Sequence, residues 1–144
     1  MKTLIVTVGL PRSGKSTWAK TTGFPVVNPD SIRMALYGQE FLVEAEDMIW
    51  TLSKYMVKSL FIAGHDTVIL DATNLTDHSR DFWISKEWDV EWKIFDTDVE
   101  ICKQRAIEGG KEKLIPIIEK MNRFKSIPTE KNDPLGVYVH DNKT

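Results

Sequence analysis

Short runs of apolar residues between polar segments predict buried strands. The first run fills residues 4–8 with aliphatic and β-branched side chains, and Gly9 follows at once. A run of this kind, bounded by a glycine turn, is typical of a strand that is buried on both faces in a parallel sheet. Weaker runs predict four more strands, at residues 25–28, 67–70, 90–95 and 137–139.

Helical patterns occupy the segments between these runs. In residues 42–63, apolar side chains recur at the three-and-four spacing of a helix that buries one stripe, and Gly64 ends the pattern. A second helix is predicted to begin near Lys15, and a third to cover residues 77–88. The last predicted helix has the apolar set Leu114, Ile117, Ile118, Met121 and Phe124.

Two further helices carry capping signals at their starts. Asp30 and Ser31 offer side-chain oxygens to the first turn of a short helix that Gly38 ends. Thr97 with Glu100 predicts a capping box for the helix that follows the fourth strand.

Alternation of strands and helices predicts an α/β fold, with right-handed βαβ units around a parallel sheet. Sheets of this type bind ligands at the carboxyl ends of their strands. Asp71 directly follows the predicted strand at residues 67–70, so its carboxylate is expected at that edge.

Composition and charge exclude several classes of protein. The 144 residues are 42% hydrophobic and 28% charged, which is the ordinary range of a folded globular chain. Lys and Arg total 19 against 21 Asp and Glu, and this net charge of −2 gives no general positive field for nucleic acid. The lone Cys102 cannot form an internal disulfide, the three histidines show no metal-ligand spacing, and no apolar run approaches the roughly 20 residues that span a bilayer. We therefore expect a single cytoplasmic domain, residues 1–144, without membrane contact.

Residues 9–16 carry the clearest chemical signal. Their sequence, GLPRSGKS, matches GxxxxGK[ST] at every fixed position and lies between a predicted strand and a predicted helix. The two glycines let consecutive backbone amides turn inward around phosphate oxygens at a helix N-terminus. Lys15 would reach the β and γ phosphates, and the Ser16 hydroxyl would ligate Mg²⁺. The predicted nucleoside triphosphate site consists of Gly9, Arg12, Ser13, Gly14, Lys15, Ser16 and Thr17.

Two common classes of nucleotide-binding protein fit the rest of the sequence poorly. The Asn-Lys-x-Asp motif that reads guanine has its only approach in residues 142–144. A large motor ATPase needs elements that couple hydrolysis to movement, for which 144 residues leave no room. A small kinase is the class that remains.

Four segments, in this order, resemble the P-loop kinases related to phage polynucleotide 5′-hydroxyl kinase: GLPRSGKSTWAK, VNPDSIRMALYG, AGHDTVILDATNLTDHSRDFW and FDTDVEICKQR. The resemblance covers about residues 2–124. It implies a three-layer P-loop NTPase fold, with a parallel sheet flanked by helices and a helical lid at about residues 103–125, before a loop-rich tail at 126–144. It also implies ATP and Mg²⁺, with phosphoryl transfer to the 5′-hydroxyl end of DNA or RNA. A phosphatase activity is not expected, because the Asp-x-Asp-Gly-Thr motif is missing.

The resemblance also assigns a catalytic base. In this family the aspartate after the second strand takes the proton from the acceptor hydroxyl, and Asp30 stands in the matching place. Arg33 follows one helical turn later, so both side chains share a helix face, and the guanidinium can clamp a phosphate of the acceptor beside the carboxylate. The alternative interpretation is a capping aspartate and a surface arginine.

Asp71 and Asn74 match the segment that lies beside the phosphate loop in these kinases. Asp71 would hold Mg²⁺ through water, together with Ser16, or bind the acceptor with Asn74. The polynucleotide kinase pattern has a carboxylate directly before Thr-Asn, whereas Ala72 stands there in this chain. The role of Asp71 is therefore open between these two functions and that of an ordinary strand-end aspartate.

Lid arginines supply positive charge to the transferring phosphate in this family. Arg105 matches the first of the two that the pattern contains, but the second is missing, because residues 108–110 are Glu-Gly-Gly. Its possible replacements are Lys111, Lys113 and Arg12. Arg80 and Arg123 are further candidates, although arginines in such positions are more often solvated surface charges.

Charge and aromatic residues leave the acceptor open. Residues 103–125 hold seven Lys and Arg against three Glu, which favours an anionic acceptor, but residues 30–50 hold five acids and one Arg, which suits a small neutral one. Trp50, Trp83, Trp88 and Trp92 have the chemistry to stack on bases, although core packing is the more common role. Two alternatives to a polynucleotide kinase remain: a kinase for a nucleoside, sugar or antibiotic hydroxyl, and a regulator that binds ATP without catalysis.

Overall fold

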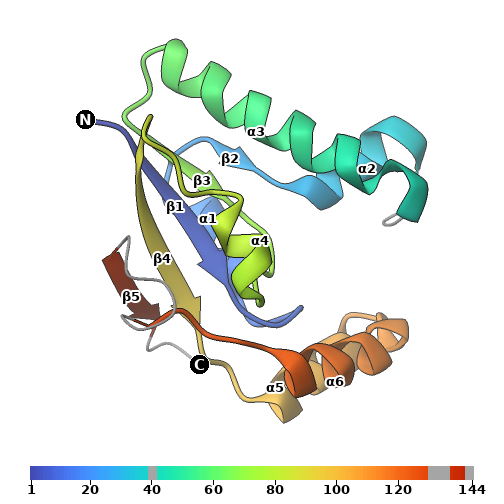
Figure 1. Ribbon diagram of the computed structural model, residues 1–144. Helices are drawn as coiled ribbons and strands as arrows, with labels where there is room; N and C mark the ends of the chain where they lie inside the picture. Colours follow the sequence, from blue (N-terminus) through green and yellow to red (C-terminus); the bar gives the residue numbers. More distant parts are fainter. Residues whose placement is uncertain (39–41, 130–136, 142–144) are drawn as a thin grey trace.

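The computed structural model contains a five-stranded parallel sheet and describes residues 1–38, 42–129 and 137–141. The strands have the order β2-β3-β1-β4-β5, and every neighbouring pair is parallel (Figure 1). Their bounds are Thr3–Val8 for β1, Val26–Val27 for β2, Thr67–Leu70 for β3, Asp89–Phe95 for β4 and Val137–Asp141 for β5. All five predicted strands are present, and the α/β prediction is confirmed.

Six α-helices connect and follow the strands in the described residues. They are α1 at Lys15–Thr21, α2 at Pro29–Tyr37, α3 at Glu46–Ile62, α4 at Asp77–Asp81, α5 at Val99–Glu108 and α6 at Ile115–Phe124. Short 3₁₀ turns lead into α3 at Val43–Ala45 and into α6 at Glu112–Leu114. Helices α5 and α6 contact each other near the ends of β1 and β4, in the segment where a lid is predicted (Figure 1). Residues 130–136 and 142–144 of the predicted loop-rich tail lie outside the described part of the chain. The Asn-Lys-Thr segment at 142–144 is among them.

Apolar side chains pack on both faces of the sheet, because successive residues of a strand point to opposite sides. On one face, Leu4 and Val6 of β1 belong to the main core together with Val57 of α3. On the other face, Ile5 packs with Ala19 of α1. Helices therefore cover the sheet from both sides, which makes the three layers of the predicted P-loop fold.

The helix predicted for residues 77–88 is wrong beyond its first turn. Helix α4 ends at Asp81, and the chain then turns so that both Trp83 and Trp88 enter the main core. The indole Nε1 of Trp88 donates a hydrogen bond of 2.9 Å to the carbonyl oxygen of Trp83. Two residues five positions apart point in different directions on a helix, so burial of both rings in one core requires the turn. Trp83, Trp88 and Trp92 are buried, which removes them as base-stacking surfaces.

Both helices are capped by a residue other than the one predicted. The side chain of Asn28, rather than that of Asp30 or Ser31, caps α2 by accepting a hydrogen bond of 3.2 Å from the Ser31 amide. Asp98, rather than Thr97, caps α5. These differences leave Asp30 in the first turn with its carboxylate available for other contacts.

Arg80 is a buried structural residue and not the surface charge that the sequence suggests. Its side chain is fully buried, and it donates to the carbonyl oxygen of Asn74 at 2.9 Å, to Asp77 Oδ1 at 2.6 Å and to the carbonyl oxygen of Ser126 at 2.5 Å. A buried guanidinium is stable only when such partners satisfy its donors. Arg80 therefore joins the loop after β3 to the segment that follows the lid.

No helix in the described ranges is long and apolar enough to cross a membrane.

Candidate active site

The phosphate loop lies between β1 and α1, at the carboxyl end of the central strand. Gly14 has φ 107°, a left-handed conformation that glycine adopts without strain. Gly9 is also closely surrounded, because a Cβ there would lie 2.7 Å from Ser13 Oγ and 3.1 Å from the carbonyl oxygen of Phe95. The Thr97 hydroxyl donates to the carbonyl oxygen of Ser13 at 2.8 Å, which fastens the loop to the end of β4. Gly14 is thus explained by its left-handed backbone conformation, and Gly9 by the lack of room for a side chain.

Lys15 is buried at the start of α1, where its ammonium group curls over the loop. Its Nζ donates to the carbonyl oxygen of Leu10 at 2.6 Å and to Ser13 Oγ at 3.4 Å. Burial lowers the pKa of Lys15 to about 8, although the charges of Asp71 and Asp30 oppose the shift. The phosphate loop thus holds a lysine that loses its proton easily until an anion arrives.

ATP binding at pH 8.5 is expected to take up about three quarters of a proton, because a pKa of about 8 leaves Lys15 mostly neutral and phosphate oxygens favour its charged form. Titration calorimetry in buffers of different ionisation enthalpy measures this uptake. At pH 7.0, where free Lys15 is already charged, the uptake should fall to about one tenth of a proton. Equal uptake at the two pH values would contradict the shifted pKa.

Ser16 and Asp71 bring two oxygen ligands together beside the loop. Ser16 Oγ donates to Asp71 Oδ2 at 2.6 Å, and Asn28 Nδ2 donates to the same oxygen at 3.1 Å. The described residues contain no group of three acidic, His or Cys side chains that would hold a metal by themselves. One carboxylate and one hydroxyl fit Mg²⁺, which keeps several waters and shares the phosphates of its nucleotide. Ser16 and Asp71 are therefore the residues that would hold it.

Asn74 sits inside the loop that follows β3. Its Nδ2 donates to the carbonyl oxygen of Thr7 at 2.8 Å, and its backbone is left-handed at φ 46°. The loop is also tied to the phosphate loop, because the amide of Gly9 donates to the carbonyl oxygen of Thr73 at 3.0 Å. The Asn74 Oδ1 atom is buried without a hydrogen-bond partner among the described residues. Asn74 thus supports the site from within, and its predicted contact with the acceptor stays a prediction.

Asp30 and Arg33 form the pair that the helix spacing predicts. Arg33 Nη1 lies 2.5 Å from Asp30 Oδ1, and the Asp30 side chain is 70% exposed whereas that of Arg33 is 9% exposed. Glu46, at the start of α3, accepts two further hydrogen bonds from Arg33, from Nε at 2.8 Å and from Nη2 at 2.5 Å. Burial lowers the pKa of Arg33, but its hydrogen bonds with Glu46 and the charge of Asp30 outweigh burial and raise the pKa overall. Arg33 therefore stays charged and holds Asp30 at the surface.

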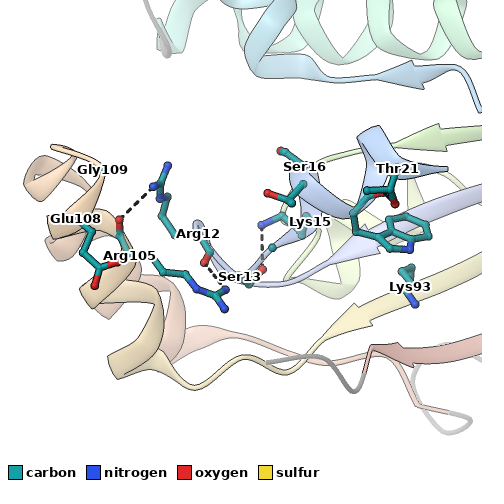
Figure 2. Close-up of a pocket in the computed structure, with 12 residues that line it drawn as sticks. Arg12, Ser13, Lys15, Ser16, Thr21, Lys93, Arg105, Glu108 and Gly109 are labelled. Carbon is teal, nitrogen blue, oxygen red and sulfur yellow. Dashed lines mark hydrogen bonds between the residues drawn. The ribbon is translucent and has the colours of Figure 1, made fainter. Parts of the chain in front are cut away.

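The lid and the phosphate loop meet through two arginines. Arg105 Nη1 donates to the carbonyl oxygen of Arg12 at 3.2 Å, and Arg12 Nη2 donates to that of Arg105 at 3.1 Å (Figure 2). Between lid and loop opens a pocket of about 860 Å³. It is lined by Arg12, Ser13, Gly14, Lys15, Ser16, Thr17, Trp18, Thr21, Lys93, Arg105, Glu108 and Gly109.

This pocket gathers most of the predicted nucleotide-binding residues with Arg105, whereas Asp30, Arg33, Asp71 and Asn74 do not line it. Asp71 is nevertheless joined to it through Ser16, and the charge of Asp30 acts on Lys15. Sequence reasoning missed Glu46 and Asn28, whose partners are distant in the chain and give no local signal. It also missed the far wall of the pocket, where Lys93 Nζ lies 5.0 Å from the centre of the Trp18 ring.

Comparison with known proteins gives one family and several similar structures. The sequence matches the AAA_33 family, described as an AAA domain, over residues 4–113. A chain in a structure of the Pnkp1/Rnl/Hen1 complex is 30% identical, with a TM-score of 0.64, and the match covers 72% of this chain and 38% of that one. A chain of the Pnkp1/Rnl/Hen1 RNA repair complex is 21% identical, with a TM-score of 0.64, over 88% of this chain and 48% of that one. A gluconokinase from Sinorhizobium meliloti 1021 is 16% identical, with a TM-score of 0.60, over 97% and 83%.

The protein spans less than half the length of the two chains from the Pnkp1/Rnl/Hen1 complexes. Its likeness to the gluconokinase concerns the fold alone. The family match covers most of the sequence, from the first strand to the end of α5 and beyond. The chain therefore belongs to the AAA_33 family of P-loop domains and has the fold of P-loop kinases.

Proposed function

We propose that the protein is an ATP-dependent polynucleotide 5′-hydroxyl kinase, which phosphorylates the 5′-hydroxyl end of DNA or RNA. The observation that carries the proposal is the Asp30–Arg33 pair, with an exposed carboxylate held at 2.5 Å by a buried guanidinium. Asp30 lies close enough to the phosphate loop for its charge to oppose the lowering of the Lys15 pKa. A carboxylate in this position has the chemistry of a general base. We also propose that residues 1–144 form one kinase domain with its lid at about residues 103–125.

The proposed reaction is one phosphoryl transfer. The 5′-hydroxyl oxygen attacks the γ-phosphorus of ATP, the bond from that phosphorus to the β–γ bridging oxygen breaks, and ADP leaves. Asp30 takes the hydroxyl proton, while Lys15 and Arg105 stabilise negative charge on the transferring group. Bound Mg²⁺ would neutralise charge on the β and γ phosphates.

Two features support a nucleic acid as the acceptor. The 30% identical chain comes from the Pnkp1/Rnl/Hen1 complex, and a second structure of that complex is described as an RNA repair complex. The lid presents exposed basic side chains, among them Lys111, Lys113 and Arg123, that suit the phosphates of a polynucleotide.

A kinase for a small hydroxyl compound is the second candidate, and the surroundings of Arg33 favour it. Two carboxylates, those of Asp30 and Glu46, already bind this guanidinium, so an acceptor phosphate has to displace one of them. Exposed Glu44 and Asp47 add negative charge nearby in the sequence. A neutral nucleoside or sugar meets no such repulsion.

Transfer of labelled γ-phosphate to a panel of acceptors tests the proposal. The panel contains a 5′-hydroxyl oligonucleotide as DNA and as RNA, the same oligonucleotides with a 5′-phosphate, free nucleosides, and gluconate as a sugar acid. Label on the 5′-hydroxyl oligonucleotides and not on their 5′-phosphorylated forms supports the proposal. Label on a small acceptor alone overturns it in favour of the second candidate, and ATP binding with no labelled acceptor indicates a regulator.

A further inference from the structure

Arg12 has an unusual backbone conformation. Its φ of 67° lies in the left-handed region, which a side chain with a Cβ rarely adopts and glycine adopts freely. A non-glycine residue in such a conformation is strained, and residues of this kind cluster at functional sites. The position would be relaxed with glycine, so the arginine side chain is the feature of Arg12 that calls for an explanation.

The guanidinium of Arg12 fills the space above Gly109 in the lid. A Cβ at residue 109 would overlap Arg12 Nη2, and it would lie 3.1 Å from Arg12 Cζ and 3.3 Å from the carbonyl oxygen of Arg105. The backbone of Gly109 itself, at φ −88° and ψ 6°, lies in the bridge region at negative φ, which residues other than glycine also adopt in turns. A side chain at residue 109 would therefore meet the Arg12 guanidinium in its present position, and the guanidinium would have to move.

Arg12 and Arg105 also differ in charge balance from the two buried arginines, Arg33 and Arg80. Among the described side chains, neither is paired with a carboxylate, whereas Arg33 binds two and Arg80 binds Asp77. Each gives one hydrogen bond to a carbonyl oxygen of the other, and each keeps further N–H groups for a ligand. Both line the pocket that contains the phosphate loop. Two unpaired guanidinium groups over a phosphate loop form a site for the terminal phosphate of a nucleotide.

From these observations we infer that Arg12 is a catalytic residue, which contacts the γ-phosphate of the donor from the phosphate loop and works with Arg105. Arg12 thereby supplies a second guanidinium beside that of Arg105, above the space that Gly109 leaves. The inference rests on the proposed function in one respect, that the donor is ATP. It does not depend on the identity of the acceptor.

An exchange of the arginine between loop and lid tests the inference. Arg12→Gly removes the guanidinium and relaxes the backbone, so the thermal unfolding temperature should not fall. Its affinity for ATP should fall by about tenfold or more while that for ADP changes little, because only ATP has the γ-phosphate. In Arg12→Gly with Gly109→Arg, an arginine returns from the lid side, and the preference for ATP over ADP should recover in large part. Arg12→Lys should restore less, because an ammonium lacks the planar fork.

Titration calorimetry with ATP and with ADP gives this readout without any acceptor, and the rate of phosphoryl transfer is measured in parallel. Unchanged preference for ATP in a folded Arg12→Gly variant would overturn the inference, as would an equal loss for ATP and ADP. A loss that Gly109→Arg does not reverse would overturn the claim that an arginine from the lid side can replace Arg12. A protein that fails to phosphorylate oligonucleotides, yet loses its ATP preference with Arg12→Gly, would contradict the proposed function and support this inference.

Discussion

Asp30→Asn is expected to lower the rate of phosphoryl transfer by about 10²- to 10⁴-fold, because the amide cannot take the proton of the acceptor hydroxyl. The substitution keeps the size of the side chain and an oxygen that can accept the hydrogen bond from Arg33. Asp30 does not line the nucleotide pocket, so the affinity for ATP should change little. Steady-state kinetics and ATP titration separate the two effects, with the loss confined to kcat.

Asp47→Asn is the matched control. It makes the same change of charge at an exposed carboxylate in the first turn of α3. Asp47 directly follows Glu46, which binds Arg33. Its rate should stay close to that of the unmodified protein. Full activity of Asp30→Asn, or equal losses in both variants, would remove Asp30 as the base.

Arg105→Ala should lower kcat by on the order of 10³-fold, because it removes a guanidinium with no carboxylate partner among the described side chains from the pocket of the phosphate loop. The contact from its Nη1 to the carbonyl oxygen of Arg12 is lost as well, so the lid should be held less firmly over the nucleotide. Arg105→Lys should recover only part of the rate, because a lysine offers charge without the fork.

Arg123→Ala is the control for this change, because it removes an exposed arginine from α6 of the same lid. Its main effect is expected on the KM for the oligonucleotide and not on kcat. Pre-steady-state measurement of the transfer step gives both comparisons. A similar kcat for Arg105→Ala and the unmodified protein would contradict a role of Arg105 in the transfer.

The sequence predicts the strands and the phosphate loop well because both are local signals. A buried parallel strand is a continuous apolar run, as in β1, and the loop needs glycines at fixed distances from Lys15. The pair of Asp30 and Arg33 follows in the same way from the spacing of three residues in a helix.

Contacts between distant segments give no such signal. Glu46 binds Arg33 across 13 positions of sequence, and Asn28 binds Asp71 across 43. The early end of α4 depends on tertiary packing, because Trp83 and Trp88 enter one core. Arg80 looks like a surface charge in the sequence, and only the approach of Ser126 shows why it is buried.

The most direct test of the proposed kinase is the transfer of labelled γ-phosphate from ATP to a 5′-hydroxyl oligonucleotide by the unmodified protein. We expect label at the 5′ end, none on the same oligonucleotide with a 5′-phosphate, and loss of the label with Asp30→Asn. Tight binding of ATP with no label on the oligonucleotide would contradict the account.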